Sequence, residues 1–308
     1  MSLNASLIKE LREKTGAGIL DCKSALTENK NDLQGAIDWL RKKGLSVAAK
    51  KSGRVAAEGL IATEILDNKG CIIEINSETD FVSRNEIFQE FVKNCALLSL
   101  SAEGSLDKLS EMSYLETDNT VKEELTKNIA TIGENLSIRR IENIKLDGEG
   151  LIVSYVHNSV SENLGKIGVL IALKSEAEKN ILKDLGKNIA MQIAATNPQS
   201  VNIENLNKGI VDRERSILLE QAISSGKPKE IAEKMVEGRI KKFYQEVVLE
   251  EQTYIIDGKS SVKQILDEVS NSANHKIEIF DFKKLVLGEG INVEEKDFAA
   301  EVAATANH

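Results

Sequence analysis

The sequence predicts an α+β fold: a bundle of three helices at the N-terminus, a duplicated β-hairpin/helix core, an inserted antiparallel helical hairpin and a short C-terminal helix. Three observations lead to this class. The chain has 308 residues, of which only 4% are aromatic and two are proline, and this composition favours long helices. Apolar residues recur at helical spacing near the N-terminus and again in the last third of the chain. Between these regions, β-rich runs occur in two similar segments.

The N-terminal helices are expected over 4–14, Ile19–Asn29 and Asp32–Lys43. The third should end at Gly44, because glycine commonly follows the last residue of a helix. Ser46–Gly53 is then a linker helix or tether. Three short helices make a bundle too small to be very stable alone, and such a bundle usually serves as a docking module.

The first half of the core begins where the apolar period changes from helix to strand. Gly59–Leu66 and Cys71–Asn76 predict a β-hairpin, and a helix is expected from about Ser83 to Leu100. Residues 101–120 are predicted to form a polar loop. Helix Val121–Ile132 follows.

A second copy of this order starts with Gly150-Leu151-Ile152, which resembles Gly59-Leu60-Ile61. The copies differ in length at two places. The second is seven residues longer in its hairpin turn, His157–Lys166. The first is four residues longer between strand and helix, and Thr79-Asp80-Phe81-Val82 lies in that stretch. The ordered similarity favours a duplicated unit over chance resemblance.

The last third of the chain is again mostly helical. Val211–Ser224 and Lys229–Val248 flank a turn that contains Pro228, which suits the start of a helix. Their apolar spacing fits a projecting antiparallel hairpin and fits core helices equally well. Beyond them we expect a helix over Ser260–Val269, a strand over His275–Leu287 and an Ala-rich terminal helix or tail over 294–306.

Charge and composition restrict the function. The net charge is −9, but residues 1–54 carry eleven Lys and Arg against six Asp and Glu, a local balance of +5. That balance keeps an RNA-binding bundle as an alternative, although Trp39 is its only aromatic residue. Three cysteines without metal or disulfide spacing predict a reduced, cytoplasmic protein. No apolar run is long enough to predict a membrane span.

Enzyme chemistry has little support. Three histidines lie far apart, and no phosphate-binding lysine loop, nucleophile elbow or zinc-protease motif occurs. We therefore expect no catalytic residues, no metal site and no cofactor.

The segment around Phe81 is the most informative. Ser83 followed by Glu86 predicts a capping box, with Val82 and Ile87 as its hydrophobic staple. Phe81 is then left without a local packing role. It is either an aromatic residue folded onto the core or an exposed wedge beside the Asp80 carboxylate.

Two long motifs now show a family resemblance. Leu11–Leu26, LREKTGAGILDCKSAL, and Glu74–Arg84, EINSETDFVSR, resemble the two signatures of the elongation factor Ts family. Lys227–Phe243 and the ending DFAAEVAA are also similar to it. The resemblance covers nearly the whole chain.

The resemblance implies a nucleotide exchange factor of translation elongation, whose partner is the GTPase elongation factor Tu in its GDP-bound form. In the family, the Thr-Asp-Phe-Val loop disturbs the Mg²⁺ beside GDP, so that GDP leaves and GTP can bind. Carried over, this role falls on Thr79, Asp80, Phe81 and Val82. Docking on the partner would involve Arg12, Ile19, Leu20, Lys23, Met235 and Val236. Ordinary bundle packing is the competing interpretation, and it is stronger for Leu20 than for Arg12.

The same resemblance implies a ubiquitin-associated-like (UBA-like) N-terminal domain and a coiled-coil insertion. His157 receives no partner role, because the turn His157–Lys166 is longer than the family's. A homodimer through the helical hairpin stays open, as does a partner contact there, and no stable nucleic-acid complex or membrane attachment is expected. The predicted domains are 1–54 with linker, 55–147, 148–287 with an insertion over about 198–249, and a C-terminal module over 288–308.

Overall fold

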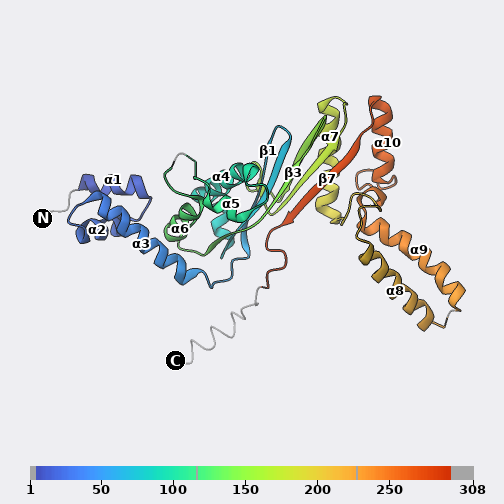
Figure 1. Cartoon of the computed structure of the whole chain (residues 1–308), viewed down its shortest axis with the longest axis horizontal. Coiled ribbons are helices and arrows are strands. Elements are labelled where there is room, and N and C mark those ends of the chain that lie inside the picture. The colour runs from blue at the N-terminus through green and yellow to red at the C-terminus, as the bar shows by residue number, and fades with distance from the viewer. Residues whose placement is uncertain (1–4, 116, 227, 293–308) are drawn as a thin grey trace.

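The computed structural model describes residues 5–115, 117–226 and 228–292 (Figure 1). In this part of the chain the fold is α+β, with helices arranged around two antiparallel sheets. The molecule is elongated: helices α1–α3 lie at one end, the sheets lie in the middle, and the α8–α9 hairpin projects at the other end. The expected terminal helix over 294–306 lies outside the described residues.

The N-terminal bundle consists of α1 (Ala5–Thr15), α2 (Ile19–Glu28) and α3 (Leu33–Lys51). The expected helix end at Gly44 is wrong, because α3 continues through the predicted linker. Gly44 is buried, and a Cβ there would make an ordinary contact, 3.7 Å from the Ala130 side chain. Around Gly44, α3 packs against the helix Val121–Ile132, and this tertiary contact outweighs the poor helix propensity of glycine.

The first sheet has the strand order β3–β2–β1–β5. Its main strands are β1 (Glu58–Leu66), β2 (Lys69–Ser77) and β3 (Leu136–Lys145), and α4 (Glu86–Ala102) covers one face. Side chains alternate between the two faces of a strand. In β2, Ile73 and Ile75 therefore pack with α4, in what we call the first core, whereas Ile72 faces the second sheet.

Two elements of this half were missed from the sequence. Strand β3 was not expected, and α5 (Leu106–Glu111) lies within the predicted loop 101–120. Helix α5 has six residues and buries only Leu109, which is too short a pattern to show a helical period. The next helix, α6 (Val121–Ile132), begins at a capping box and has the expected bounds.

The second sheet has the order β4–β6–β7, with β4 (Gly150–His157), β6 (Ile167–Lys174) and β7 (Glu278–Val286). Helix α7 (Lys179–Thr196) covers its outer face. The inner faces of the two sheets meet in an aliphatic layer. Its buried members are Ile61, Ile72, Ile144, Leu146, Ile152, Leu170, Ala172 and Leu285.

The two hairpin-and-helix units share unusual local geometry. Gly59 and Gly150 both have positive φ, 126° and 155°, and a Cβ at either would collide with a carbonyl of the paired strand. The central strands also carry matching register shifts, between Glu74 and Ile75 in β2 and between Ala172 and Leu173 in β6. Shared backbone irregularities of this kind support the interpretation of a duplicated unit.

The long turn between β4 and β6 is part of the first sheet. Its strand β5 (Leu164–Gly165) pairs with β1, where Ala62 lies opposite Leu164. Leu164 is fully buried in the first core. The extra residues of the second copy therefore join the two halves, while His157 stays exposed.

The projecting hairpin is formed by α8 (Lys208–Ser224) and α9 (Lys229–Val247). Val236 and Ile240 are buried in it, so the predicted apolar stripe is the contact between its two arms. Helix α10 (Val262–Ala273) packs on the second sheet next to the base of the hairpin.

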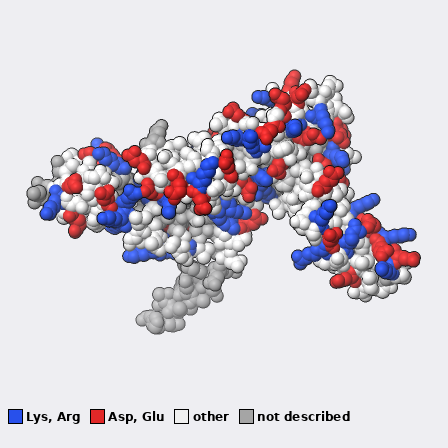
Figure 2. Space-filling view, in the orientation of Figure 1, with Lys and Arg blue, Asp and Glu red and all other residues white. Residues whose placement is uncertain are grey.

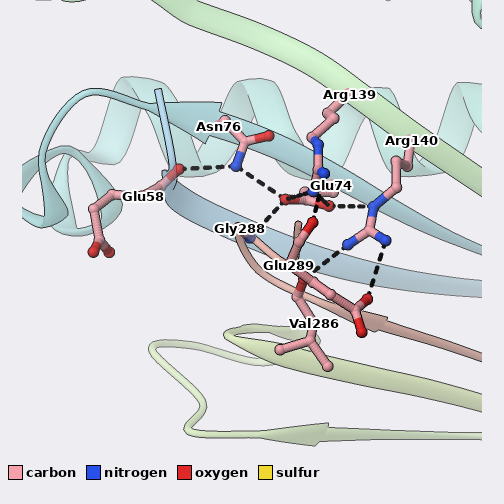
Figure 3. A network of polar contacts seen from close by, with 8 residues as sticks. All are labelled: Glu58, Glu74, Asn76, Arg139, Arg140, Val286, Gly288 and Glu289. Carbon is pink, nitrogen blue, oxygen red and sulfur yellow. Dashed lines mark hydrogen bonds and ion pairs between the residues drawn. The ribbon is translucent and has the colours of Figure 1, made fainter. Parts of the chain in front are cut away.

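A buried carboxylate joins the first sheet to the chain that follows β7 (Figure 3). Glu74 accepts hydrogen bonds from Arg139 at 3.0 Å and Arg140 at 2.5 Å, both in β3. It also accepts one from the Gly288 backbone N–H at 2.8 Å. Arg140 in turn donates to the Val286 carbonyl at 2.8 Å. The exit of the chain from the second sheet is thereby held against the first.

Candidate functional site

The segment Thr79–Val82, which we call the Phe81 loop, begins two residues after the end of β2 at Ser77. It leads into a short 3-10 helix, Asp80–Arg84. Such a helix has about three residues per turn, so neighbouring side chains point in different directions. Phe81 is 78% exposed and Asp80 is exposed, whereas Val82 is only 4% exposed and packs in the first core. The loop thus presents an aromatic ring and a carboxylate to solvent. Phe81 is not a core aromatic residue.

The predicted capping box at Ser83 is wrong. Asn85 caps α4 instead, and its side chain accepts hydrogen bonds from the Ile87 and Phe88 N–H groups at 2.9 and 3.3 Å. Ile87 is half exposed, so it forms no staple with the buried Val82. The helix starts later because Asp80–Arg84 forms a separate turn, in which the Ser83 hydroxyl donates to the Asp80 carbonyl at 2.6 Å.

The start of the loop is held by three hydrogen bonds on Thr79. The Ser77 hydroxyl donates to the Thr79 carbonyl at 2.9 Å. The Thr79 N–H and hydroxyl both donate to the Glu134 carboxylate, at 2.9 and 2.6 Å. Sequence reasoning missed Glu134, because it lies 55 residues away and no local pattern marks it. The exposed Phe81 therefore stands on a turn whose backbone is fixed on both sides.

The residues predicted to dock on a partner through the bundle are all exposed. Arg12 lies in the last turn of α1, and Ile19, Leu20 and Lys23 lie at the start of α2. Leu20 is 78% exposed, so the interpretation of Leu20 as a bundle-packing residue is wrong. Ile19 beside it is 56% exposed, so two consecutive large apolar side chains are in water at the start of α2. Exposed apolar patches, unlike single residues, mark interaction surfaces.

Comparisons with known proteins identify the family of the chain. A family model described as Elongation factor TS matches residues 78–289, from the start of the Phe81 loop to the end of the second sheet and beyond. Proteins named elongation factor Ts are similar over almost their whole length. Examples come from Rhodospirillum centenum (48% identical, 99% of both chains), Rhodospirillum rubrum (50%, 98% of both) and Agrobacterium fabrum (46%, 99% of this chain and 98% of the relative).

The chain belongs to the elongation factor Ts family. Membership gives it a role in translation elongation, as a nucleotide exchange factor. The family model starts at Glu78, so the N-terminal bundle lies before the matched range. The similar proteins nevertheless cover that bundle as well.

In this elongation factor Ts family member, the two contact residues predicted on the α8–α9 hairpin, Met235 and Val236, differ in their exposure. Met235 is half-buried on α9 and keeps part of its side chain accessible. Val236 is 2% exposed and packs between α8 and α9. Any effect of Val236 on a partner therefore has to act through the packing of the hairpin.

Two buried cysteines are unreactive, and the cleft beside α10 lies apart from the Phe81 loop. Burial raises the pKa of Cys71 to about 12 and also raises that of Cys95, so neither thiol is ionised near neutral pH. The described residues contain no cluster of side chains suited to a metal ion, and none of their helices has the length and apolar character needed to cross a bilayer. A cleft of about 800 Å³ beside α10 includes no residue of the Phe81 loop.

Proposed function

We propose that this chain binds elongation factor Tu in its GDP-bound form and releases GDP by inserting Phe81 beside the magnesium ion of the nucleotide site. The observation that carries the proposal is the 78% exposure of Phe81 on a turn anchored at both ends. An exposed Phe on a fixed backbone enters a partner's pocket with little further loss of conformational freedom.

The energy available from this ring suits the task. Burying a Phe side chain contributes about 1.5–3 kcal/mol, which corresponds to roughly ten- to a hundredfold in an equilibrium constant. If the ring is buried only where it displaces groups that hold GDP, this energy appears as coupling between the factor and the nucleotide. Coupling is reciprocal, so bound GTP later weakens the factor's binding by the same route.

Asp80 supplies the electrostatic part of the proposal. Mg²⁺ is bound by oxygen ligands in a near-ideal octahedral arrangement, which tolerates little distortion. An exposed carboxylate brought next to it competes with the existing ligands. Loss of the metal leaves the phosphate charges of GDP less well neutralised, and GDP leaves faster.

Docking would be divided among separate surfaces. Ile19 and Leu20 provide apolar contact on the bundle, with Arg12 and Lys23 as flanking charges. Apolar anchors surrounded by polar residues are typical of binding hot spots. These contacts set affinity, whereas the Phe81 loop sets the rate of GDP release.

The experiment is stopped-flow release of a fluorescent GDP from elongation factor Tu. Phe81→Ala should slow release at saturating factor by roughly ten- to a hundredfold, because the ring no longer enters the site. Leu66→Ala is the matched control: Leu66 is 58% exposed at the opposite end of the β1–β2 hairpin. Equal maximal rates for Phe81→Ala and the unchanged chain would refute the proposal.

The charges of the bundle give no support to the RNA-binding alternative. Lys43 pairs with Asp21 at 2.6 Å, and Lys14 pairs with Glu10 at 3.0 Å. On the face drawn in Figure 2, basic and acidic side chains of the bundle are intermixed. Non-specific nucleic-acid binding depends on a continuous basic surface, which this face lacks.

A further inference from the structure

The turn between α6 and β3 lies directly against the Phe81 loop. Strands β2 and β3 pair up to Ser77 and Leu136, and the antiparallel register would next bring Glu78 opposite Asn135 and Thr79 opposite Glu134. Here the backbone ladder stops and carboxylates replace carbonyls as acceptors. Glu78 accepts from the Asn135 N–H at 2.6 Å, and Glu134 accepts from the Thr79 N–H at 2.9 Å.

Glu134 binds Thr79 with both of its carboxylate oxygens. Oε2 accepts the backbone N–H, and Oε1 accepts the hydroxyl at 2.6 Å. Two bonds from one planar group restrict rotation of Thr79 as well as its position. Thr79 immediately precedes the 3-10 helix that carries Phe81, so its orientation determines where the ring points.

The turn that carries Glu134 is itself held by the end of α3. The Asn135 side chain donates to the Arg54 carbonyl at 2.8 Å, and Asn135 is only 8% exposed. Lys51 donates to the Gly133 carbonyl, and the Arg54 guanidinium lies 3.3 Å from the Glu78 carboxylate. Glu134 is thus placed by contacts that do not involve Phe81.

We propose that Glu134 is a positioning residue for the Phe81 loop, Thr79–Val82. It holds Thr79 so that Phe81 already points in its active direction before the partner binds. The proposal rests on the proposed function of Phe81. Without Glu134 the loop would bind in several orientations, only some of which reach the nucleotide site. The loss should therefore appear in the maximal rate of GDP release rather than in docking, which the bundle supplies.

The test measures GDP release over a range of factor concentrations. Glu134→Ala should lower the maximal rate about tenfold, since charge-assisted hydrogen bonds of this kind are lost, and should leave the half-saturating concentration within about twofold. If the substitution only left part of the variant protein unfolded, the half-saturating concentration would rise and the maximal rate of GDP release would not change. Glu134→Gln keeps one acceptor for the Thr79 N–H and should recover most of the rate. The exposed Glu142 of β3 gives the control, Glu142→Ala.

Two further variants separate the possible failures. Thr79→Val removes one of the two bonds and should give a smaller loss than Glu134→Ala, which keeps the test available if Glu134→Ala does not fold. In a Phe81→Ala background, Glu134→Ala should slow release no further. An equal additional loss there, or an unchanged maximal rate for Glu134→Ala alone, would overturn the positioning role and leave the wedge proposal standing. If Phe81→Ala itself has no effect, the proposed function fails and the positioning role fails with it.

Discussion

Replacing the buried Glu74 by glutamine should destabilise the whole core. The carboxylate is completely buried and accepts hydrogen bonds from Arg139, Arg140, Asn76 and Gly288 (Figure 3). Glutamine keeps the size but turns an NH₂ group toward donors. It leaves Arg139 without a counter-charge and leaves Arg140 with only the exposed Glu289, 3.3 Å away. Removing one partner of a buried ion pair costs about 3–5 kcal/mol. The arginine side chains are 26% and 28% exposed and can bind water, so we expect the lower end, about 3 kcal/mol.

Urea unfolding followed by circular dichroism measures this loss. With a slope of about 3 kcal/mol per molar for a protein of this size, the midpoint should fall by about 1 M. The control is Glu103→Gln, which removes an exposed carboxylate paired with Lys108 and should change the midpoint far less. A midpoint for Glu74→Gln equal to that of the control would show that the network does not stabilise the core.

The pH dependence gives a second check on Glu74. Burial by itself would raise the pKa of Glu74, but the hydrogen bonds from Gly288 and Asn76 and the contact with Arg140 hold the pKa below its usual value. A carboxyl group whose pKa is lower in the folded state stabilises the fold above its unfolded pKa. That stabilisation disappears as the pH falls through the folded pKa. The stability difference between the unchanged chain and Glu74→Gln should therefore shrink at acid pH, and a constant difference would refute this account.

Two other predictions concern the ends of the molecule. Leu20→Ser should raise the half-saturating concentration for GDP release about tenfold, because burial of a Leu side chain contributes about 1.5–3 kcal/mol. The thermal midpoint should not change, since Leu20 is exposed. An unchanged half-saturating concentration would show that Leu20 is not in the interface. Ile240→Ala should cost the hairpin about 2–5 kcal/mol and speed amide exchange in α8 and α9 only. Faster exchange in the sheets as well would show that the hairpin is not an independent unit.

Only part of the site was predictable, because the sequence left Phe81 either folded onto the core or exposed. The expected staple put Val82 inside for the wrong reason: Val82 is buried in the first core and forms no staple with Ile87. Phe81 is exposed, which only the structure decides. The predicted cap was wrong by two residues, since Asn85 and not Ser83 caps α4. Both residues are good capping side chains, and spacing alone does not choose between them. The role of Phe81 in nucleotide release stays a prediction.

Glu134 and Glu74 show why other parts of the site and the fold could not be predicted from the sequence. In the sequence, each is a single acidic residue between uncharged neighbours, and no local pattern marks its role. Each acquires its role from groups far away in the sequence: Thr79 lies 55 residues from Glu134, and Gly288 lies 214 residues from Glu74. Such contacts depend on strand register, which apolar alternation specifies only for the buried faces.

The sequence by itself therefore determined the α+β class, most of the helices and the two hairpins, because periodicity and capping act over a few neighbouring residues. Only the tertiary structure decided that α3 continues through Gly44, that the long turn at Leu164 completes the first sheet, and that Glu134 holds the loop. These three features have one physical cause. Each depends on a surface that exists only after distant segments have packed together, and that packing outweighs the local preferences that a sequence displays.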